Sequence, residues 1–191
     1  YQATLALRKT VPSHLPVSVK VRLGWDCTSQ AFEIADAVQQ GGATEITIHG
    51  RTKADGYHAD RINWEKIGEV RSRLTIPVIA NGEIWRWEDG QACLKATGCE
   101  DLMVGRGALN IPNLSLVLKQ NCEKMSWTDI QKILQKYAEM ENFHDSGFYH
   151  VARIKQWLRY LNKEYPEADI VFERIKTSKT AEDLRERLCQ G

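Results

Sequence analysis

The sequence predicts a parallel α/β fold followed by an all-helical part. Four short apolar runs rich in β-branched residues alternate with amphipathic helical stretches in residues 1–112, and only helical patterns follow in residues 113–191. Strands that alternate with helices favour a parallel sheet with helices packed on it. The end of this alternation places a division between the two parts near Asn113.

Two strand–helix units open the chain. Residues Pro16–Leu23 (PVSVKVRL) form a β-rich run, and a helical stretch from about Ser29 to Gln40 follows. The pair Gly41-Gly42 ends this helix. The second strand is Glu45–His49 (EITIH).

Two further units complete the α/β part. Apolar residues at helical spacing lie between Trp64 and Leu74, before the continuous apolar run Ile76–Ala80 (IPVIA). A helix over Trp87–Thr97 ends at Gly98, and Asp101–Val104 (DLMV) is the last strand. Such strands are typical of sheets that are apolar on both faces, so we expect helices to cover them.

The second part carries helical patterns over about 126–142, 149–163, 167–175 and 181–188. Ser126 and Thr180 are candidate N-caps, because each precedes a helical pattern and has an acid three residues later. In the helix over 149–163, Val151, Ile154 and Leu158 begin one apolar stripe.

The composition excludes several classes of protein. Charged residues make up 27% and hydrophobic residues 42% of the chain, which is typical of a globular protein and not of a disordered or coiled-coil chain. No run approaches the roughly 18 apolar residues of a membrane span, so we expect no membrane contact. A net charge of +1 means that nucleic-acid binding would need a local basic patch.

The cysteines and the first residue indicate the context of the chain. The five cysteines are odd in number and form no C-x-x-C pair, which favours a reduced, cytoplasmic location and argues against a metal site. Residue 1 is Tyr and the first methionine is Met103, so we expect the chain to be a piece of a longer protein.

Two glycine turns follow the last two strands. These are Asn81-Gly82-Glu83 and Gly105-Arg106-Gly107. Glycine lets backbone N–H groups approach an anion closely, and eight-stranded α/β barrels often bind phosphate in the loops after their last two strands. The pair therefore predicts a phosphate site, although either turn alone is also compatible with a tight turn that binds nothing.

Charged and polar side chains stand at the ends of the first two strands. Lys20 lies inside an apolar strand, where a cation is costly unless it is paired or directed at a ligand. His49 ends the next strand, at the rim where barrel active sites lie. A solvent-reaching lysine and a hydrogen-bonded core histidine are the alternatives. The loop Arg51–Arg61 is either a substrate-gripping loop or a solvated connection.

A basic segment lies in the helical part. Between Ser146 and Lys163 there are five basic side chains, counting His150, and no acid. Basic residues interleaved with tyrosines suit an RNA backbone with a stacked base, whereas a charged helix face is also often only solvated.

Several motifs carry a family resemblance: VSVKVRLGW, ITIHGRT, DGYHADRINW, IPVIANGEIW, VGRGAL and YHVARIKQWL. In this order and spacing they resemble the C-terminal portion of the bacterial tRNA-dihydrouridine synthases. Their C type, which acts on the D-loop uridine at position 16, is the most similar. The resemblance implies the last four units of a flavin-binding TIM (β/α)8 barrel in residues 1–112 and a helical tRNA-binding domain in residues 113–191.

The resemblance also implies roles for individual residues. Lys20 is similar to a lysine that contacts the isoalloxazine ring of FMN, and His49 to a histidine beside that ring. The phosphate and ribityl site would comprise Asn81, Gly82 and Glu83 together with Gly105 and Arg106. Positions that would hold tRNA are Tyr57, Arg73, Arg153, Lys155, Tyr160 and Lys176.

The reaction that the resemblance implies is reduction of uridine to 5,6-dihydrouridine, with FMN as cofactor and NADPH as reductant. The proton-donor cysteine of the family is expected upstream of Tyr1, so we assign no catalytic residue in this chain and expect the chain alone to be inactive. The complete protein would be monomeric and cytoplasmic. The residues alone leave two alternatives, namely another phosphate-binding barrel enzyme with Lys20 as a Schiff-base lysine, and a tRNA-binding fragment without catalysis.

Overall fold

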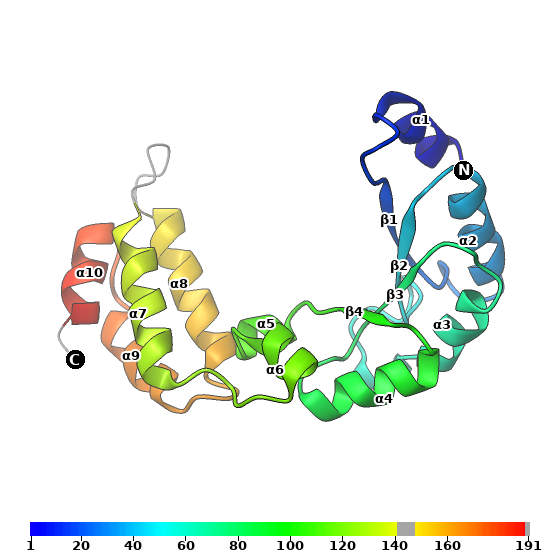
Figure 1. Ribbon diagram of the computed structural model, residues 1–191. Coiled ribbons are helices and arrows are strands. Elements are labelled where there is room, and N and C mark those ends of the chain that lie inside the picture. Colours follow the sequence, from blue (N-terminus) through cyan, green and yellow to red (C-terminus); the bar gives the residue numbers. More distant parts are fainter. Residues whose placement is uncertain (141–147, 190–191) are drawn as a thin grey trace. The chain divides into compact units, whose positions relative to one another are not determined.

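The computed structural model describes residues 1–140 and 148–189, and the side chains of Phe148 and Cys189 are not described. The last two residues of the helix predicted over 126–142 therefore lie outside the described residues. The chain divides into two compact units, Tyr1–Gly105 and Arg106–Gly191, and each is described by itself (Figure 1). The sequence placed this division at 112/113, a few residues later along the chain.

The first unit is built on a four-stranded parallel sheet. Its strands are β1 (Ser18–Arg22), β2 (Glu45–His49), β3 (Val78–Asn81) and β4 (Asp101–Met103). They pair in chain order, β1-β2-β3-β4, and every pair is parallel. The predicted α/β class with four parallel strands is confirmed.

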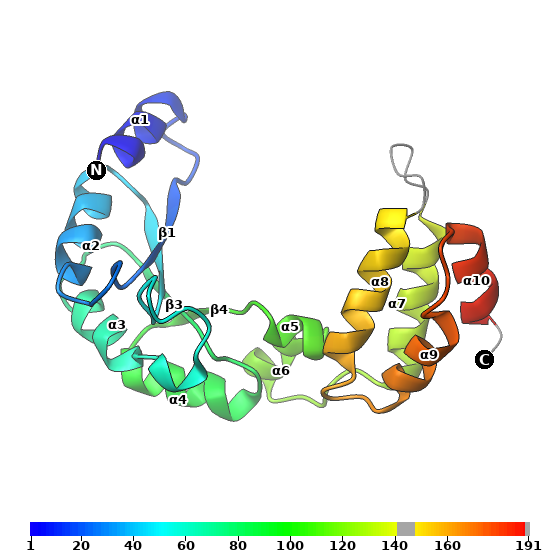
Figure 2. The same cartoon turned by 180° about the vertical axis from the view of Figure 1, so that it is seen from behind.

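Three helices connect these strands and lie along one side of the sheet (Figures 1 and 2). They are α2 (Ala31–Gln40), α3 (Trp64–Arg71) and α4 (Trp87–Thr97), and each packs against the next in chain order. Ile46, Ile48 and Ala80 are almost fully buried on the helix side of the sheet. As predicted, Gly98 ends α4, in a left-handed conformation.

The opposite face of the sheet differs from the prediction of two apolar faces. Successive side chains of a strand alternate between faces, so Lys20 and Arg22 share the face that does not hold Val19 and Val21. The register pairs Arg22 with His49 and His49 with Asn81. One face of the sheet is therefore apolar, and the other carries a row of polar side chains.

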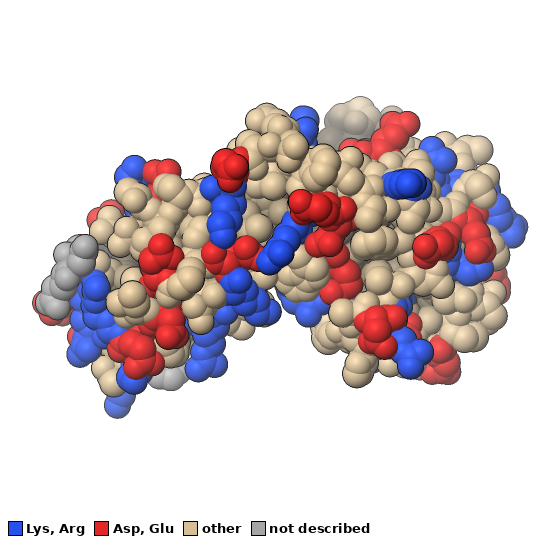
Figure 3. Space-filling view, turned by 90° about the horizontal axis from the view of Figure 1, so that it is seen from below, with Lys and Arg blue, Asp and Glu red and all other residues tan. Residues whose placement is uncertain are grey.

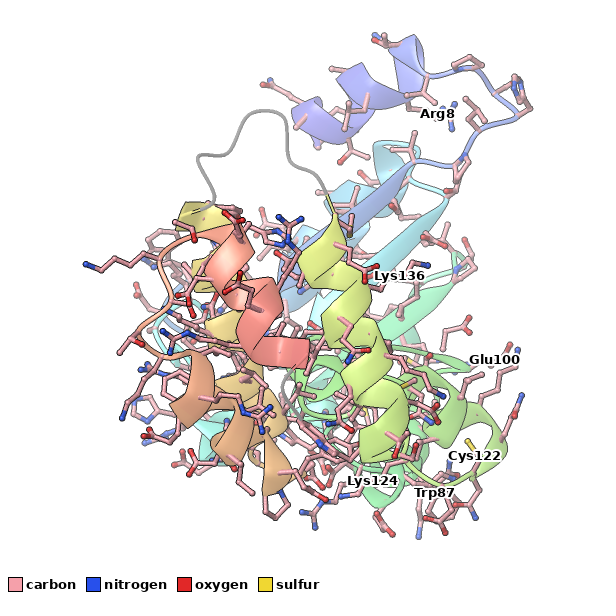
Figure 4. All side chains as sticks on the ribbon, turned by 90° about the vertical axis from the view of Figure 1, so that its left-hand side faces the viewer. Arg8, Trp87, Glu100, Cys122, Lys124 and Lys136 are labelled. Atoms are coloured by element: carbon pink, nitrogen blue, oxygen red, sulfur yellow. The ribbon has the colours of Figure 1, made fainter. Side chains whose placement is uncertain are left out.

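An N-terminal helix, α1 (Gln2–Thr10), was not predicted from the sequence. It packs against the end of α2, where a Cβ atom on Gly41 would lie 2.7 Å from Thr4 Cβ and one on Gly42 would lie 2.8 Å from Arg8 Cγ. The Arg8 guanidinium donates hydrogen bonds to the carbonyls of Val11, Pro12 and Leu15 (Figure 4). The two glycines therefore permit this contact as well as ending α2.

The described part of the second unit contains helices joined by loops, and no strand. The helices are α5 (Gly107–Asn110), α6 (Leu114–Gln120), α7 (Trp127–Glu139), α8 (Phe148–Leu161), α9 (Glu167–Ile175) and α10 (Ala181–Cys189). The short α5 and α6 were not predicted. Both predicted N-caps form, because Ser126 Oγ accepts the Asp129 N–H at 3.2 Å and Thr180 Oγ1 accepts the Asp183 N–H at 3.2 Å.

The core of the second unit lies between α7, α8, α9 and α10. The predicted stripe on α8 is buried in it and includes Ile154, Leu158 and Leu161, none of which is measurably exposed. Lys124 lies just before α7 in the sequence. Its ammonium donates to the Glu164 carbonyl at 2.6 Å and lies 4.6 Å from the Tyr165 ring centroid (Figure 4). No helix in the described part of the chain has the length and apolar character that crossing a bilayer requires.

Candidate functional site: the carboxyl ends of the strands and a basic groove

Lys20 and Asn81 are joined at the carboxyl end of the sheet. The Lys20 ammonium donates a hydrogen bond to Asn81 Oδ1 at 2.9 Å, and Asn81 Nδ2 donates to the Met103 carbonyl at 2.7 Å. Burial and the nearby Arg22 charge lower the pKa of Lys20 from its usual value. The amide of Asn81 thus holds a cation over the polar face of the sheet.

His49 lies in the same row and is surrounded by cations. Burial lowers its pKa to about 4, and the charges of Lys20, Arg22 and Arg51 add to the shift, while Glu83 opposes it. Its Nδ1 atom is buried and has no hydrogen-bond partner among the described residues. At neutral pH His49 is therefore an uncharged imidazole at the strand ends.

The turn after β3 has an unusual backbone. Gly82 has φ +124°, and a Cβ atom there would lie 2.5 Å from Ile62 Cδ1. Glu83 also has a positive φ, of +53°. Two indoles hold this turn, because Trp64 Nε1 donates to the Gly82 carbonyl at 3.0 Å and Trp85 Nε1 donates to Glu83 Oε2 at 2.9 Å.

The loop after β2 is hydrogen-bonded to the end of β1. The Arg22 guanidinium donates to the Thr52 carbonyl at 2.6 Å, and Thr52 Oγ1 donates to Asp55 Oδ2 at 2.7 Å. The short 3-10 helix η1 (Ala59–Arg61) completes the loop. Tyr57 is 73% exposed at its tip. An ordered loop therefore presents the tyrosine that was predicted to contact tRNA.

The second glycine turn falls at the junction of the two units. Gly105 is the last residue of the first unit, and a Cβ atom on it would meet no atom within 4 Å. Arg106 opens the second unit, in front of the four-residue α5. The expected pairing of this turn with Asn81-Gly82-Glu83 in one phosphate site stays a prediction.

A groove in the second unit brings predicted tRNA residues together. It has a volume of about 550 Å³ and is lined by Tyr149, Ala152, Arg153, Lys155, Gln156, Arg159, Phe172 and Lys176. A second hollow, of about 360 Å³, is lined in part by Arg153, Trp157 and Tyr160. Four of the six predicted tRNA positions thus lie around Arg153, whereas Tyr57 and Arg73 belong to the first unit.

The cations of this groove already have contacts inside the unit. Arg153 stacks on Tyr149, with its guanidinium carbon 4.5 Å from the ring centroid, and it donates to Gln156 at 2.7 Å. The Lys155 ammonium donates to the carbonyls of Lys176 at 2.8 Å and Ser178 at 2.6 Å. Lys155 therefore fastens the segment after α9, a structural role that the sequence did not indicate.

Figure 3 shows acidic and basic side chains interspersed on the visible face of the molecule. Arg73, predicted to hold tRNA, is paired with Asp36 at 3.1 Å and lies over the Phe32 ring at 4.7 Å. These contacts connect the segment after α3 to α2. The contact of Arg73 with tRNA stays a prediction.

The cysteines whose surroundings are described differ in their exposure. Cys93 and Cys99 are buried, and burial raises the pKa of Cys93 to about 12 and also raises that of Cys99. Cys27 is exposed, and a hydrogen bond with Ser29 lowers its pKa. The described part of the chain contains no cluster of His, Cys, Asp and Glu suited to a metal ion.

The comparison with protein families decides the family. The model of the dihydrouridine synthase (Dus) family matches residues 1–189. This chain belongs to the dihydrouridine synthase family. The resemblance predicted from the sequence motifs is thereby confirmed.

Curated dihydrouridine synthases resemble the chain along nearly its whole length. The tRNA-dihydrouridine(16) synthase of Haemophilus influenzae is 79% identical over 188 residues, which are 98% of this chain and 61% of that protein. Those of Pasteurella multocida and Escherichia coli K12 are 69% and 57% identical, over 98% and 96% of this chain and 60% and 58% of those proteins. The chain thus spans about 60% of the length of these relatives.

Among solved structures, mandelate oxidase with (S)-2-phenylpropionate aligns with a TM-score of 0.41 and 14% identity, over 97% of this chain and 67% of that one.

One residue of the strand-end site was missed by sequence reasoning. Arg51 has no exposed surface and pairs with Glu83, 32 residues later. Its position directly after His49-Gly50 was the available signal, but the pairing of two loops is not encoded in local spacing.

Proposed function

We propose that this chain supplies the flavin-binding strand ends and the tRNA-docking helices of a tRNA-dihydrouridine synthase that acts on uridine 16. Membership of the family and the names of relatives up to 79% identical support the reaction. The single observation that carries the site is the Lys20–Asn81 hydrogen bond, because it holds a cation at the carboxyl ends of parallel strands, where barrel enzymes bind their ligands.

The proposed architecture is the last four strand–helix units of a TIM barrel in residues 1–112, followed by a helical domain in residues 113–191. The strand order β1-β2-β3-β4 supports it, because a barrel requires each parallel strand to pair with the next. The polar face of the sheet would then line the inside of the barrel, and the helices would lie outside. The remaining units are proposed to lie in a part of the protein that these 191 residues do not include.

The strand-end residues fit an FMN molecule. Lys20 is a hydrogen-bond donor held by Asn81, and the turn at Gly82, which packs against Ile62, lies beside His49. FMN, when bound, supplies the hydride chemistry, with NADPH as its reductant. Lys20 would stabilise negative charge on the flavin ring through its ammonium group.

The other predicted cofactor residues would bind and orient. His49, uncharged at neutral pH, would form a hydrogen bond at the ring without adding a second positive charge. Asn81, Gly82 and Glu83 together with Gly105 and Arg106 would hold the ribityl chain and phosphate, with Arg106 as the charged partner. The proton for the uracil ring is proposed to come from a cysteine outside this chain, as the family resemblance implies.

The second unit is proposed to dock tRNA. The groove around Arg153 presents cations beside Tyr149 and Phe172, which suits contact with phosphates and a stacked base. Tyr57 and Arg73 would add contacts from the first unit. The target base must leave its stack to reach a flavin. A tRNA substrate would place the protein in the cytoplasm, where we propose that it acts as a monomer.

A chimera tests the function of this chain. The 188 matched residues replace their counterparts in the Haemophilus influenzae relative, and the chimera is expressed in a strain that lacks dihydrouridine at position 16. We expect nucleoside mass spectrometry to detect restored dihydrouridine. A chimera that folds and leaves the tRNA unmodified, while the unaltered relative restores it, would contradict the proposal.

A further inference from the structure

Arg51 connects the loops that follow three consecutive strands. Its carbonyl accepts the Leu23 N–H at 3.0 Å, at the end of β1, and its own N–H donates to the His49 carbonyl at 2.7 Å, at the end of β2. Its guanidinium forms an ion pair with Glu83, in the turn after β3. No other cation of the described chain is both fully buried and engaged in such an ion pair.

Glu83 has a backbone conformation that is costly for a residue other than glycine. A left-handed conformation at a residue other than glycine costs about 1–2 kcal/mol, and Glu83 has φ +53°. Gly82 precedes it with φ +124°. Two consecutive residues of the turn are thus held away from the ordinary regions. Contacts of the Glu83 carboxylate with Arg51 and Trp85 oppose relaxation of the turn.

The ion pair is poorly explained as a source of stability. Arg51 is fully buried, and its Nε and Nη1 atoms have no hydrogen-bond partner among the described residues. Burial of a charge with incomplete hydrogen bonding offsets most or all of what the ion pair contributes. A buried pair that adds little to stability can still fix the relative positions of the loops that it joins.

We propose that Arg51 is a positioning residue, and that its ion pair with Glu83 fixes the turn Asn81-Gly82-Glu83 in the conformation that its ligand requires. Arg51 has no exposed surface, so it acts through its ion-pair partner Glu83. The identity of the ligand as FMN rests on the proposed function. The positioning role does not rest on the proposed function. The indole N–H groups of Trp64 and Trp85 are hydrogen-bonded to the turn, so their protection from exchange measures its order without any ligand.

The charges around His49 give the proposal a second signature. His49 faces Lys20, Arg22, Arg51 and Glu83. Removal of the Arg51 charge takes away one of the cations that lower the pKa of His49, so that pKa rises, whereas removal of the Glu83 charge lowers it. A residue that only filled space would leave this pKa unchanged.

The experiment compares Arg51→Met, Arg51→Lys and Glu83→Gln in the full chain. Arg61→Met is the matched control, since Arg61 is an exposed arginine of the same loop. The readouts are hydrogen exchange at the indole N–H groups of Trp64 and Trp85, the NMR titration of His49, and the dissociation constant of FMN with the same substitutions in the chimera described above. We expect Arg51→Met to lower protection of the Trp64 indole about tenfold, as for a local opening, and to raise the pKa of His49. Arg61→Met changes neither.

Glu83→Gln keeps the proposal testable when Arg51→Met does not fold, because it removes the ion pair without changing size. It should also lower protection of the Trp64 indole, and it should lower the pKa of His49. Unchanged Trp64 protection in either folded variant would overturn the proposal. If the chimera described above and its variants bind no FMN while the indoles respond as expected, the positioning role stands and the proposed cofactor fails.

Discussion

Lys20 and Asn81 are in contact although they lie on strands that are not neighbours. β2 lies between β1 and β3, and the Lys20 ammonium still donates to Asn81 Oδ1 at 2.9 Å. Neighbouring strands are about 4.8 Å apart, so the two residues are separated by about twice that distance and only a long side chain can bridge them. The lysine therefore crosses the polar face of β2, beside Thr47 and His49, and sets the position of a cation over the middle of the sheet.

The two glycines of the proposed phosphate site should differ in what they tolerate. Gly82→Ala is expected to destabilise the chain by about 1–3 kcal/mol, because φ is +124° and the new Cβ would meet Ile62. Gly105→Ala is expected to stay within about 0.5 kcal/mol of the parent, because its surroundings are open. Urea unfolding measures both, and equal effects would contradict this description of the turns.

The low pKa of His49 predicts a pH dependence of stability. The unfolded histidine takes up a proton near pH 6.5 and the folded one near pH 4. Between these values the unfolded state binds more protons, so the free energy of unfolding falls as the pH is lowered from 6.5 towards 4 and is unaffected by His49 above that window. Because His49 is only partly buried, we expect a loss of about 1–2 kcal/mol.

Urea unfolding at several pH values measures this dependence, with His49→Gln as the comparison. The variant should lose less stability than the parent across the same window. Parallel curves for the two proteins would show that His49 is not the responsible group.

Arg153 should contribute to tRNA affinity through phosphate contact. Arg153→Ala is expected to weaken tRNA binding about three- to tenfold and to reduce the slope of log K against log salt by about one. Lys132→Ala is the control, because Lys132 is an exposed cation on α7 outside both hollows. Fluorescence anisotropy over a salt series gives both quantities, and an unchanged slope for Arg153→Ala would remove this residue from the proposed interface.

Lys155 should contribute more to the stability of the second unit than to tRNA affinity. Its ammonium donates to two carbonyls after α9, so Lys155→Met is expected to destabilise the second unit by about 1 kcal/mol and lower its Tm. Thermal unfolding followed by circular dichroism measures this change. If Lys155→Met leaves the Tm unaltered and weakens tRNA binding as much as Arg153→Ala does, its main role is RNA contact.

The strands and most helices were predictable because each depends on local pattern. The β-rich run Pro16–Leu23 contains β1, and EITIH is β2 itself. Glycine after a helical stretch marked the end of α4. By contrast, α1 buries only Thr4 and packs against the glycines after α2, a contact that no local pattern reveals.

The sequence allowed us to predict which residues form the site, but not how most of them interact. Family motifs pointed to Lys20, His49 and Asn81, which the register places on one face. The uncharged state of His49 could not be predicted, because it depends on cations from separate segments. The Arg51–Glu83 pair is likewise a long-range contact.

The most direct test of the central claim is the FMN dissociation constant of the chimera described above and of its Lys20→Met variant. We predict that the chimera purifies with flavin bound, that Lys20→Met weakens FMN binding about tenfold, which corresponds to about 1.4 kcal/mol, and that the exposed Lys95→Met changes nothing. A folded chimera without flavin, or a Lys20→Met variant that binds FMN as tightly as its parent, would contradict the account.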